Sequence, residues 1–484
     1  MNTTLDAQLW AAAPLILMAV GIVIVMLVIA GTRNHRAIAQ LTTLGFVLTC
    51  IVSLMPERAT EVTPLLLIDD YARWVMALIA AAGAVTTALI YGYLADHDGY
   101  REEMYLLLLL AAFGAMVLAA SCHAASLLLG LETLSIALFG MIAYPLRYAR
   151  PLEAAIKYLI LSAAATATLL LGFAFIYAMT GRLQFGPLGA AVAALSGADR
   201  AIAHAGLALI WVGFAFKLSL APFHLWTADV YEGAPAPVAG FLAAVSKGAV
   251  AVALLRWLDA AALAQTPALA HMLSVLAVAS IAIGNLGALQ QNNVKRLLAY
   301  SSIAHFGYLL VPFLVGGSVA REAVLFYVAA YTVMTLGSFG AVAALSGSQA
   351  RDDADHLYDY RGLFWRRPLV TSVFVPMLLA QAGVPLTVGF LAKFYVLAAA
   401  VEQHAWMLAL AVIVGSAVGL YYYLRLAIVQ FLPKPGGMQR EARLSEAAVA
   451  TSVALVSLVV ALIGAGIWPQ PLAAAVSRAL AGSG

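Results

Sequence analysis

The segment LALIWVGFAFKLSLAPF (residues 207–223) is apolar enough to lie in a bilayer, yet it carries Lys217 near its middle. Three more apolar segments have a central charge, namely Glu132 in SLLLGLETLSIALFGMIA (126–143), Lys247 in VAGFLAAVSKGAVAVALL (238–255) and Lys393 in LTVGFLAKFYVLAAAV (386–401). Each charge at bilayer depth costs at least ~2.5–3.5 kcal/mol, so four cost on the order of 10 kcal/mol. Because a proton path needs a line of buried titratable groups, these four residues are the candidates for one.

The composition is that of a polytopic membrane protein. Of 484 residues, 64% are hydrophobic and 10% are charged, whereas a soluble domain carries roughly 25% charged residues. The mean hydropathy is +0.96, and apolar runs of about 20 residues, enough to cross the bilayer as a helix, recur along the chain. We therefore predict a single all-α membrane domain (1–484) with about fourteen transmembrane helices, at 10–31, 37–55, 73–95, 103–120, 122–144, 154–179, 202–223, 236–256, 271–289, 297–316, 322–346, 369–400, 406–431 and 447–468.

The sequence gives no motif for a bound cofactor or metal. Its two cysteines, Cys50 and Cys122, are far apart, and the absence of a C-x-x-C pair argues against iron–sulfur clusters and structural zinc. There is no phosphate-binding GxxxxGK[ST] loop, and Gly186 and Gly189 do not open a strand–helix unit that could hold a dinucleotide. The net charge of +3 gives no indication of nucleic-acid binding.

The distribution of basic residues predicts the orientation. Lys and Arg are more frequent in the loops that follow odd-numbered spans than in those that follow even-numbered spans. The positive-inside rule assigns the richer loops to the cytoplasm. Both termini are then expected to face outward, away from the cytoplasm.

Two of the predicted spans are interrupted by proline. The seventh runs into Pro222 and is followed by GAPAPVAG (233–240), and the twelfth contains Pro376 and then AGVPLTVG (382–389). Proline breaks or kinks helices, and freed backbone groups are tolerated at membrane depth only inside protein or next to water. Paired broken helices in transporters often mark an inverted repeat around the site, and here each break has a lysine beside it.

Each candidate also has a purely structural explanation. Glu132 is either a proton acceptor and anionic partner of Lys217, or a neutral acid bonded to a neighbouring helix. Burial favours the neutral forms of a Glu–Lys pair and pairing favours the charged forms, so such a pair can hold or release a proton. For Lys217, Lys247 and Lys393 the structural explanation is snorkelling, although all three lie too far from their span ends to reach the interface comfortably. Arg425, near the end of its span, fits a snorkelling or structural role.

Three further residues are secondary candidates. His224 and His305 can relay protons near neutral pH, although a helix–helix hydrogen bond explains either equally well. Lys157 and Glu153 have the spacing of an i,i+4 ion pair on a helix, and Lys157 is a candidate for proton uptake. Asp229 and Glu232 are expected to set loop geometry.

Several motifs together resemble one protein family. FKLSLAPFHLWTADVYEGAPAPVAGFLAAVSK (216–247) is similar to the seventh and eighth helices of the subunit N family of bacterial respiratory complex I, an antiporter-like membrane subunit. The same family is indicated by LLGLETLSIALFG (128–140), EAAIKYLILSAAA (153–165), NNVKRLLAYSSIAHFGYLL (292–310), YRGLFWRRP (360–368), VGFLAKFYVLA (388–398) and GSAVGLYYYLR (415–425). Two related subunits are expected to differ from this chain. Subunit M carries a glutamate where this chain has Lys393, and subunit L continues into a long lateral helix. Both differences favour the subunit N family.

The resemblance implies a fold and a set of roles. The fold would hold fourteen helices, with N-terminal helices 1–4 (10–120), two inverted five-helix repeats (103–256 and 271–431), discontinuous helices 7 and 12, and a last helix (447–468). By motif, the buried proton-path residues would be Glu132, Lys217, Lys247 and Lys393, with Lys157, His224 and His305 in secondary positions.

The expected function is proton translocation in the membrane arm of an NADH:quinone oxidoreductase, a translocase. This chain would perform no redox catalysis, because partner subunits would bind NADH, FMN, iron–sulfur clusters and quinone. Its partners would be neighbouring antiporter-like and small membrane subunits and membrane lipids, with no nucleic acid. Two alternatives are a redox-independent multisubunit cation/proton antiporter, which would exchange sodium for protons without NADH, and a passive scaffold of the membrane arm.

Overall fold

The computed structural model describes residues 2–55, 60–95, 99–144, 149–261, 267–346, 353–433 and 446–482. Its N-terminal part contains α1 (Asn2–Ala11), α2 (Ala13–Gly31), α3 (His35–Ser53), β1 (Thr60–Thr63), β2 (Leu66–Ile68) and α4 (Asp70–Tyr93). The next part contains α5 (Glu103–Ala120), α6 (Ala124–Ala143), α7 (Ala149–Thr180), α8 (Leu188–Ala193), α9 (Gly197–Lys217), α10 (Leu225–Gly233), α11 (Ala236–Phe241), the π-helix η1 (Leu242–Ser246) and α12 (Lys247–Ala261).

The remainder begins with α13 (Pro267–Leu289), α14 (Val294–Val315) and α15 (Ser318–Leu345). After these come the 3-10 helix η3 (Leu357–Tyr360), α16 (Leu363–Arg366), α17 (Pro368–Ala382), α18 (Val388–Glu402), α19 (Trp406–Val429), α20 (Glu446–Ile467) and α21 (Gln470–Ala481). Thirteen helices of the described chain are long and apolar enough to cross a membrane. With the broken pair α17–α18 they account for the predicted fourteen spans, so the expected all-α polytopic fold is confirmed.

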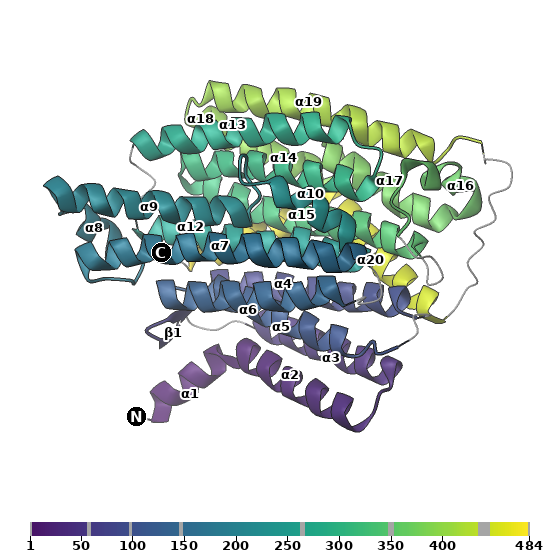
Figure 1. The fold of residues 1–484 in the computed structure, drawn as a ribbon, viewed down its shortest axis with the longest axis horizontal. Coiled ribbons are helices and arrows are strands. Elements are labelled where there is room, and N and C mark those ends of the chain that lie inside the picture. The colour runs from purple at the N-terminus through teal and green to yellow at the C-terminus, as the bar shows by residue number, and fades with distance from the viewer. Residues whose placement is uncertain are drawn as a thin grey trace.

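The helices lie side by side in one bundle, with α1 and α2 along one edge and α13 and α19 at the opposite edge (Figure 1). The interior is formed by the segment Ala236–Ala260 and by α14 and α15. The most apolar 18 residues of the first segment are 100% buried, and 83% of the corresponding stretch is buried in each of the two helices. The outer helices α2 and α20 are only 28% buried, which suits helices that face lipid. These two helices are the most apolar of the thirteen described spans and the least buried, the reverse of a water-soluble bundle.

Polar side chains fix where several helices begin. Asp69 Oδ1 accepts a 2.8 Å hydrogen bond from the backbone N–H of Ala72 at the start of α4, and Asn293 Oδ1 accepts one of 3.0 Å from Arg296 at the start of α14. Thr387 caps α18 in the same way. Such caps satisfy backbone donors that a helix leaves unpaired, which is required where helix ends lie close to the hydrocarbon.

Both predicted helix breaks are present. α9 ends at Lys217, and seven residues of turn, including Pro222, precede α10. α17 ends at Ala382, Gly383 takes a left-handed backbone with φ of 88°, and α18 begins at Val388. An interruption that the sequence did not predict is η1, which ends directly before Lys247. Single π-helical turns inside helices frequently accompany functional sites.

Some elements were not anticipated from hydropathy. Strands β1 and β2 pair antiparallel, with Thr60 opposite Ile68. Helix α8 lies between the predicted spans 154–179 and 202–223, and α21 follows the last span. Helix α21 is amphipathic and packs against α4 and α15 through Val476 and Ala479. Some of the basic residues that set the predicted orientation lie outside the described residues, namely Arg58, Arg147, Arg351, Lys434, Arg440 and Arg443.

Candidate functional site

Lys217 is the last residue of α9, at the first helix break. Its Nζ donates 2.7 Å hydrogen bonds to the hydroxyls of Ser135 on α6 and Ser162 on α7. The break places the ammonium at a helix C-terminus, where unpaired carbonyls and the helix dipole favour positive charge. The buried lysine is therefore held by two neutral oxygens and a helix end.

Glu132 lies one helical turn before Ser135 on α6. Its Oε1 accepts a 2.7 Å hydrogen bond from the hydroxyl of Thr166 on α7, and it lies within electrostatic reach of Lys217. The sequence-based hypothesis paired the two residues directly, whereas the hydrogen bonds of Lys217 go to the serines. Glu132 therefore has the bond to a neighbouring helix that its structural alternative predicted, and it also lies within electrostatic reach of Lys217.

Lys247 is the first residue of α12 and is fully buried. Its Nζ donates a 2.8 Å hydrogen bond to the hydroxyl of Ser302 on α14. Around it lie three aromatic rings, with centroids 5.2 Å from Nζ for Tyr231, 5.3 Å for Phe306 and 5.8 Å for Trp226. A cation near aromatic faces is favoured by the ring quadrupoles, so this apolar site can still hold an ammonium.

Lys393 lies on α18, beside the second break. Its Nζ donates a 3.1 Å hydrogen bond to the backbone carbonyl of Ala382, the last residue of α17, and lies 5.2 Å from the ring centroid of Tyr308. The carbonyl is free to accept because the helix ends there. The interruption of the twelfth span therefore supplies the oxygen that holds its lysine.

One face of α14 connects Lys247 with Lys393. Ser302, His305 and Tyr308 follow each other three residues apart, a spacing that places them along one side of a helix. Ser302 accepts from Lys247, the rings of His305 and Tyr308 lie 5.8 Å apart, and Tyr308 faces Lys393. The structure thus brings His305 into the row of buried lysines.

The other secondary candidates lie elsewhere. His224, 9% exposed, precedes α10 within electrostatic reach of Lys247. Lys157 forms the predicted ion pair with Glu153, at 2.7 Å, and a second with Asp229, at 3.0 Å. Lys157 therefore belongs to a charged cluster away from the hydrogen bonds of the buried lysines.

This charged cluster joins α7, α10 and α14. Arg296 Nη1 lies 2.8 Å from carboxylate oxygens of both Asp229 and Glu232. These two acids were expected to shape a loop, and that expectation is wrong, because they lie on α10 and pair with α14. Arg425 has the structural role considered for it, since it donates to the backbone carbonyls of Leu289 and Gln291 after α13.

Sequence reasoning missed the hydroxyls that bond the lysines. Ser135 and Ser162 carry no motif of their own, although a serine three residues after a buried glutamate was a usable signal. Tyr327 and Tyr423, which bond His305, were hidden among the 20 tyrosines of the chain. Only the packing of helices distant in sequence identifies such partners.

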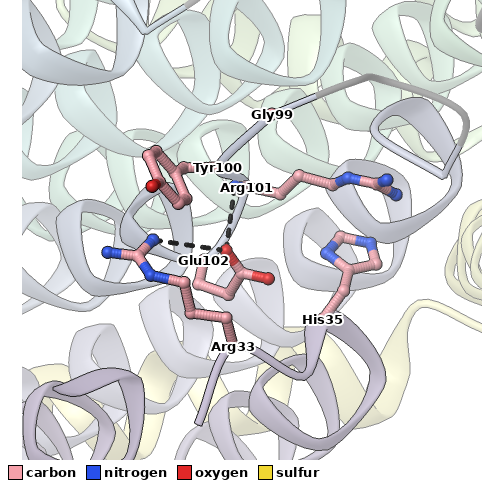
Figure 2. A pocket seen from close by; sticks show the side chains of 6 residues that line it. All are labelled: Arg33, His35, Gly99, Tyr100, Arg101 and Glu102. Atoms are coloured by element: carbon pink, nitrogen blue, oxygen red, sulfur yellow. Dashed lines mark hydrogen bonds and ion pairs between the residues drawn. The ribbon is translucent and has the colours of Figure 1, made fainter. Parts of the chain in front are cut away.

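A polar pocket of about 410 Å³ lies between the end of α2, the start of α3 and the segment that precedes α5 (Figure 2). It is lined by Arg33, His35, Gly99, Tyr100, Arg101 and Glu102. The Arg33 guanidinium lies 3.8 Å over the ring of Tyr100 and 2.8 Å from Glu103 Oε1. The pocket carries charges of both signs and none of the buried lysines. In the described part of the chain, no group of three or more His, Cys, Asp and Glu side chains could hold a metal ion.

Buried lysines beside helix breaks, bonded by serine hydroxyls and a backbone carbonyl, are typical of an antiporter-like membrane subunit. A model of the family described as "NADH:quinone oxidoreductase/Mrp antiporter, TM" matches residues 121–419. A protein of Ectopseudomonas mendocina (strain ymp), named NADH-quinone oxidoreductase subunit N, is 46% identical over 482 residues, covering 98% of this chain and 96% of the relative. The chain belongs to the subunit N family of NADH-quinone oxidoreductase, as its motifs indicated.

Solved structures agree with this assignment. A chain in the structure of respiratory complex I from Thermus thermophilus with bound aureothin aligns with a TM-score of 0.82 and 32% identity, covering 96% of this chain and 99% of that one. A chain of the Mrp complex from Dietzia sp. DQ12-45-1b aligns with a TM-score of 0.80, covering 99% of this chain and 97% of that one. Its identity is 18%, so this second likeness concerns the fold alone.

Proposed function

We propose that this chain translocates protons in the membrane arm of an NADH:quinone oxidoreductase, along Glu132, Lys217, Lys247 and Lys393. The observation that carries the proposal is the face of α14, where Ser302, His305 and Tyr308 follow one another along one side of the helix. Ser302 bonds Lys247, and Tyr308 lies 5.2 Å from Lys393. A structural lysine needs one stable partner, whereas a relay needs neighbours that can pass a proton onward.

The redox chemistry belongs to other subunits in this proposal. NADH, FMN, the iron–sulfur clusters and quinone bind to partner chains, and this chain acts as one subunit of the translocase. Its partners are neighbouring antiporter-like and small membrane subunits. This assignment is supported by the name of the 46% identical relative and by the 32% identical complex I chain.

The chemistry of the lysine sites suits a proton carrier. Lys217 and Lys247 bond serine hydroxyls, and Lys393 bonds a backbone carbonyl. These acceptors are neutral, so the charge on each ammonium is not cancelled by contact with a carboxylate. A unit charge about 8 Å away changes the energy of such a group by roughly 2 kcal/mol at an effective dielectric of about 20, more than tenfold in protonation equilibrium. Movement of charge along the row can therefore load or unload each lysine in turn.

Glu132 controls the first lysine and Lys393 releases the proton in this scheme, with Lys247 between them. His305 lies on the path and His224 beside it, while the cluster around Lys157 is the candidate for uptake. With both termini periplasmic in a bacterial inner membrane, Lys157 lies toward the cytoplasm, as uptake requires. The two breaks, each with a lysine, support inverted repeats over 103–256 and 271–431.

Charge removal tests the proposal. Lys217→Ala and Glu132→Ala should lower quinone-linked turnover and proton pumping in vesicles, while NADH oxidation by an artificial electron acceptor is unchanged. Arg200→Ala, at the exposed start of α9, removes a charge from the same helix and should have no effect. Wild-type pumping by both buried-charge variants would refute the path. A membrane scaffold would lose only assembly, and an antiporter would exchange sodium for protons without NADH.

A further inference from the structure

His305 is held between two tyrosine hydroxyls from different helices. Its Nδ1 lies 2.6 Å from Tyr327 Oη on α15, and its Nε2 lies 3.1 Å from Tyr423 Oη on α19. The imidazole is 2% exposed. In a neutral imidazole one nitrogen donates and the other accepts, so one of these tyrosines must donate to the ring while the other accepts from it.

The arrangement continues back to α14. Tyr423 Oη also hydrogen-bonds Ser301 Oγ, one helical turn before His305. A hydroxyl donates one hydrogen bond and can accept others. Ser301, Tyr423, His305 and Tyr327 therefore form one chain in which every link can point in either direction. Ser302, the next residue of α14, holds the ammonium of Lys247, so the chain begins one residue away from a side chain that bonds a lysine of the proposed path.

The neighbouring tyrosine is bonded differently. Tyr422 Oη donates a 3.2 Å hydrogen bond to Asn285 Oδ1, and Asn285 Nδ2 donates 2.9 Å to Tyr308 Oη. Tyr422 and Tyr423 are equally buried, each 1% exposed, and their rings lie 4.4 Å apart. An amide passes protons far less readily than an imidazole or a hydroxyl. Tyr422 also bonds Ser301 and Tyr423, but the hydroxyl that bonds His305 is that of Tyr423.

We propose that Tyr423 is a proton-relay residue, whose hydroxyl connects Ser301, next to the Lys247 site, with His305. The proposal rests on the proton-translocating function proposed above. A proton reaching the Ser301 hydroxyl displaces the serine proton to Tyr423, and Tyr423 passes its own proton to His305 Nε2. His305 then holds this proton as an imidazolium whose Nδ1–H donates to Tyr327 Oη. One proton enters at Ser301, His305 gains one, and no electrons change hands.

The chain points the other way after each transfer. Loss of the extra proton from His305 and rotation of the two hydroxyls restore the starting state, or the same links carry the proton back from His305 to Ser301. Tyr423→Phe keeps the ring and its packing and removes a single oxygen. That oxygen is the hydroxyl that bonds both Ser301 and His305. His305 Nε2 and Ser301 then lose a shared partner, while the hydrogen bond between His305 and Tyr327 remains.

The test compares two tyrosine variants in the whole complex. Complexes carrying Tyr423→Phe, Tyr422→Phe or Lys247→Ala are reconstituted in vesicles, and proton pumping, quinone-linked turnover and the effect of D₂O on turnover are measured. Loss of one proton-transfer group should lower the pumping rate by roughly tenfold or more in Tyr423→Phe and increase its D₂O effect. Tyr422→Phe leaves the hydrogen bond between Tyr423 and His305 in place, so its loss of pumping and its change in D₂O effect should both be much smaller.

Each other outcome decides against the relay. Normal pumping in Tyr423→Phe with defective pumping in Lys247→Ala overturns the relay and leaves the proposed function intact. Equal losses in the two tyrosine variants indicate packing. Normal pumping in Lys247→Ala would show that protons do not pass through Lys247, and it would refute both the proposed path and the relay that depends on it. If Tyr423→Phe does not assemble, Ser301→Ala cuts the same chain without touching a ring, and it must lower pumping for the relay to stand.

Discussion

The ammonium of Lys217 donates a 2.7 Å hydrogen bond to the hydroxyl of Ser135, which lies one turn after Glu132 on the same helix. A conformational change that moves α6 therefore changes two things at once. It changes the hydrogen bond between Lys217 and Ser135, and it changes the distance between Lys217 and the carboxylate of Glu132. This coupling requires only a small displacement of α6 relative to α9. Ser135 and Ser162 thus become testable parts of the site.

Removing both hydroxyls should impair the lysine without removing it. In Ser135→Ala with Ser162→Ala, the buried ammonium loses two acceptors, and an unsatisfied charged donor costs more than about 1–3 kcal/mol. Proton pumping per NADH oxidised should fall, while NADH oxidation by an artificial acceptor stays normal. Ser372→Ala, at an exposed position of α17, is the control. Wild-type pumping in the double variant would mean that the serines are dispensable.

Gly383 should be needed for the position of Lys393. Its φ of 88° costs a residue with a side chain roughly 1–2 kcal/mol. A Cβ there would lie 3.0 Å from Lys393 Cδ and 3.4 Å from its Nζ. Gly383→Ala should therefore lower both thermal stability and pumping.

The matched control for that substitution is Gly464→Ala on α20. No atom lies within 4 Å of a Cβ built there, and alanine is favoured over glycine in a helix by up to about 1 kcal/mol. Its stability should equal or exceed that of the wild type, with normal pumping. An unchanged melting temperature and normal pumping in the Gly383→Ala complex would show that the backbone conformation at the helix break does not determine the position of Lys393.

Arg256 should be a main stabilising residue between α4 and α12. Its Nη2 and Nη1 lie 2.6 and 3.1 Å from the two oxygens of Asp69, and its guanidinium lies 4.8 Å over the Tyr71 ring. Arg256→Ala leaves a buried carboxylate unpaired, which typically costs about 3–5 kcal/mol. The melting temperature and the yield of assembled complex should both fall.

Arg321→Ala is the comparison for Arg256. Arg321 lies 3.9 Å from Asp259, and 40% of its side chain is exposed, so its removal should cost only about 0–1 kcal/mol. Arg256→Lys should be intermediate, because lysine keeps the charge but loses the bidentate geometry. Equal melting temperatures for Arg256→Ala and Arg321→Ala would contradict the burial argument.

The sequence predicted the parts of this fold that depend on local composition. Apolar runs gave the spans, prolines gave the breaks at Lys217 and Lys393, and the cost of buried charge singled out Glu132 and the three lysines. The Lys157–Glu153 pair was predictable because four residues bring two side chains together on any helix. These features depend on a single segment each.

The missed features depend on contacts between segments. Which oxygens bond Lys217 is decided by the packing of α6 and α7 against α9, and in lipid no apolar periodicity identifies the packed face of a helix. Asp229 and Glu232 were assigned to a loop because α10 is a short helix between two breaks. Helix α21 escaped detection because its polar face lowers its average hydropathy. Tyr423 acquires its place only because α19 lies beside α14.

Asp355 gives a prediction for the dependence of stability on pH. It lies between α15 and η3, outside the spans, and burial raises the pKa of its carboxyl, an effect that Lys295 and the 2.8 Å hydrogen bond from Asn293 oppose. Because the pKa is higher in the folded state, the stabilisation from this group is fully present below the unfolded pKa of about 3.9. It is lost as the pH rises through the folded pKa. Asp355→Asn should therefore melt at a temperature that rises relative to the wild type between about pH 4 and pH 7. Asp199→Asn, at the exposed start of α9, is the control, and a pH-independent difference for Asp355→Asn would contradict the assignment.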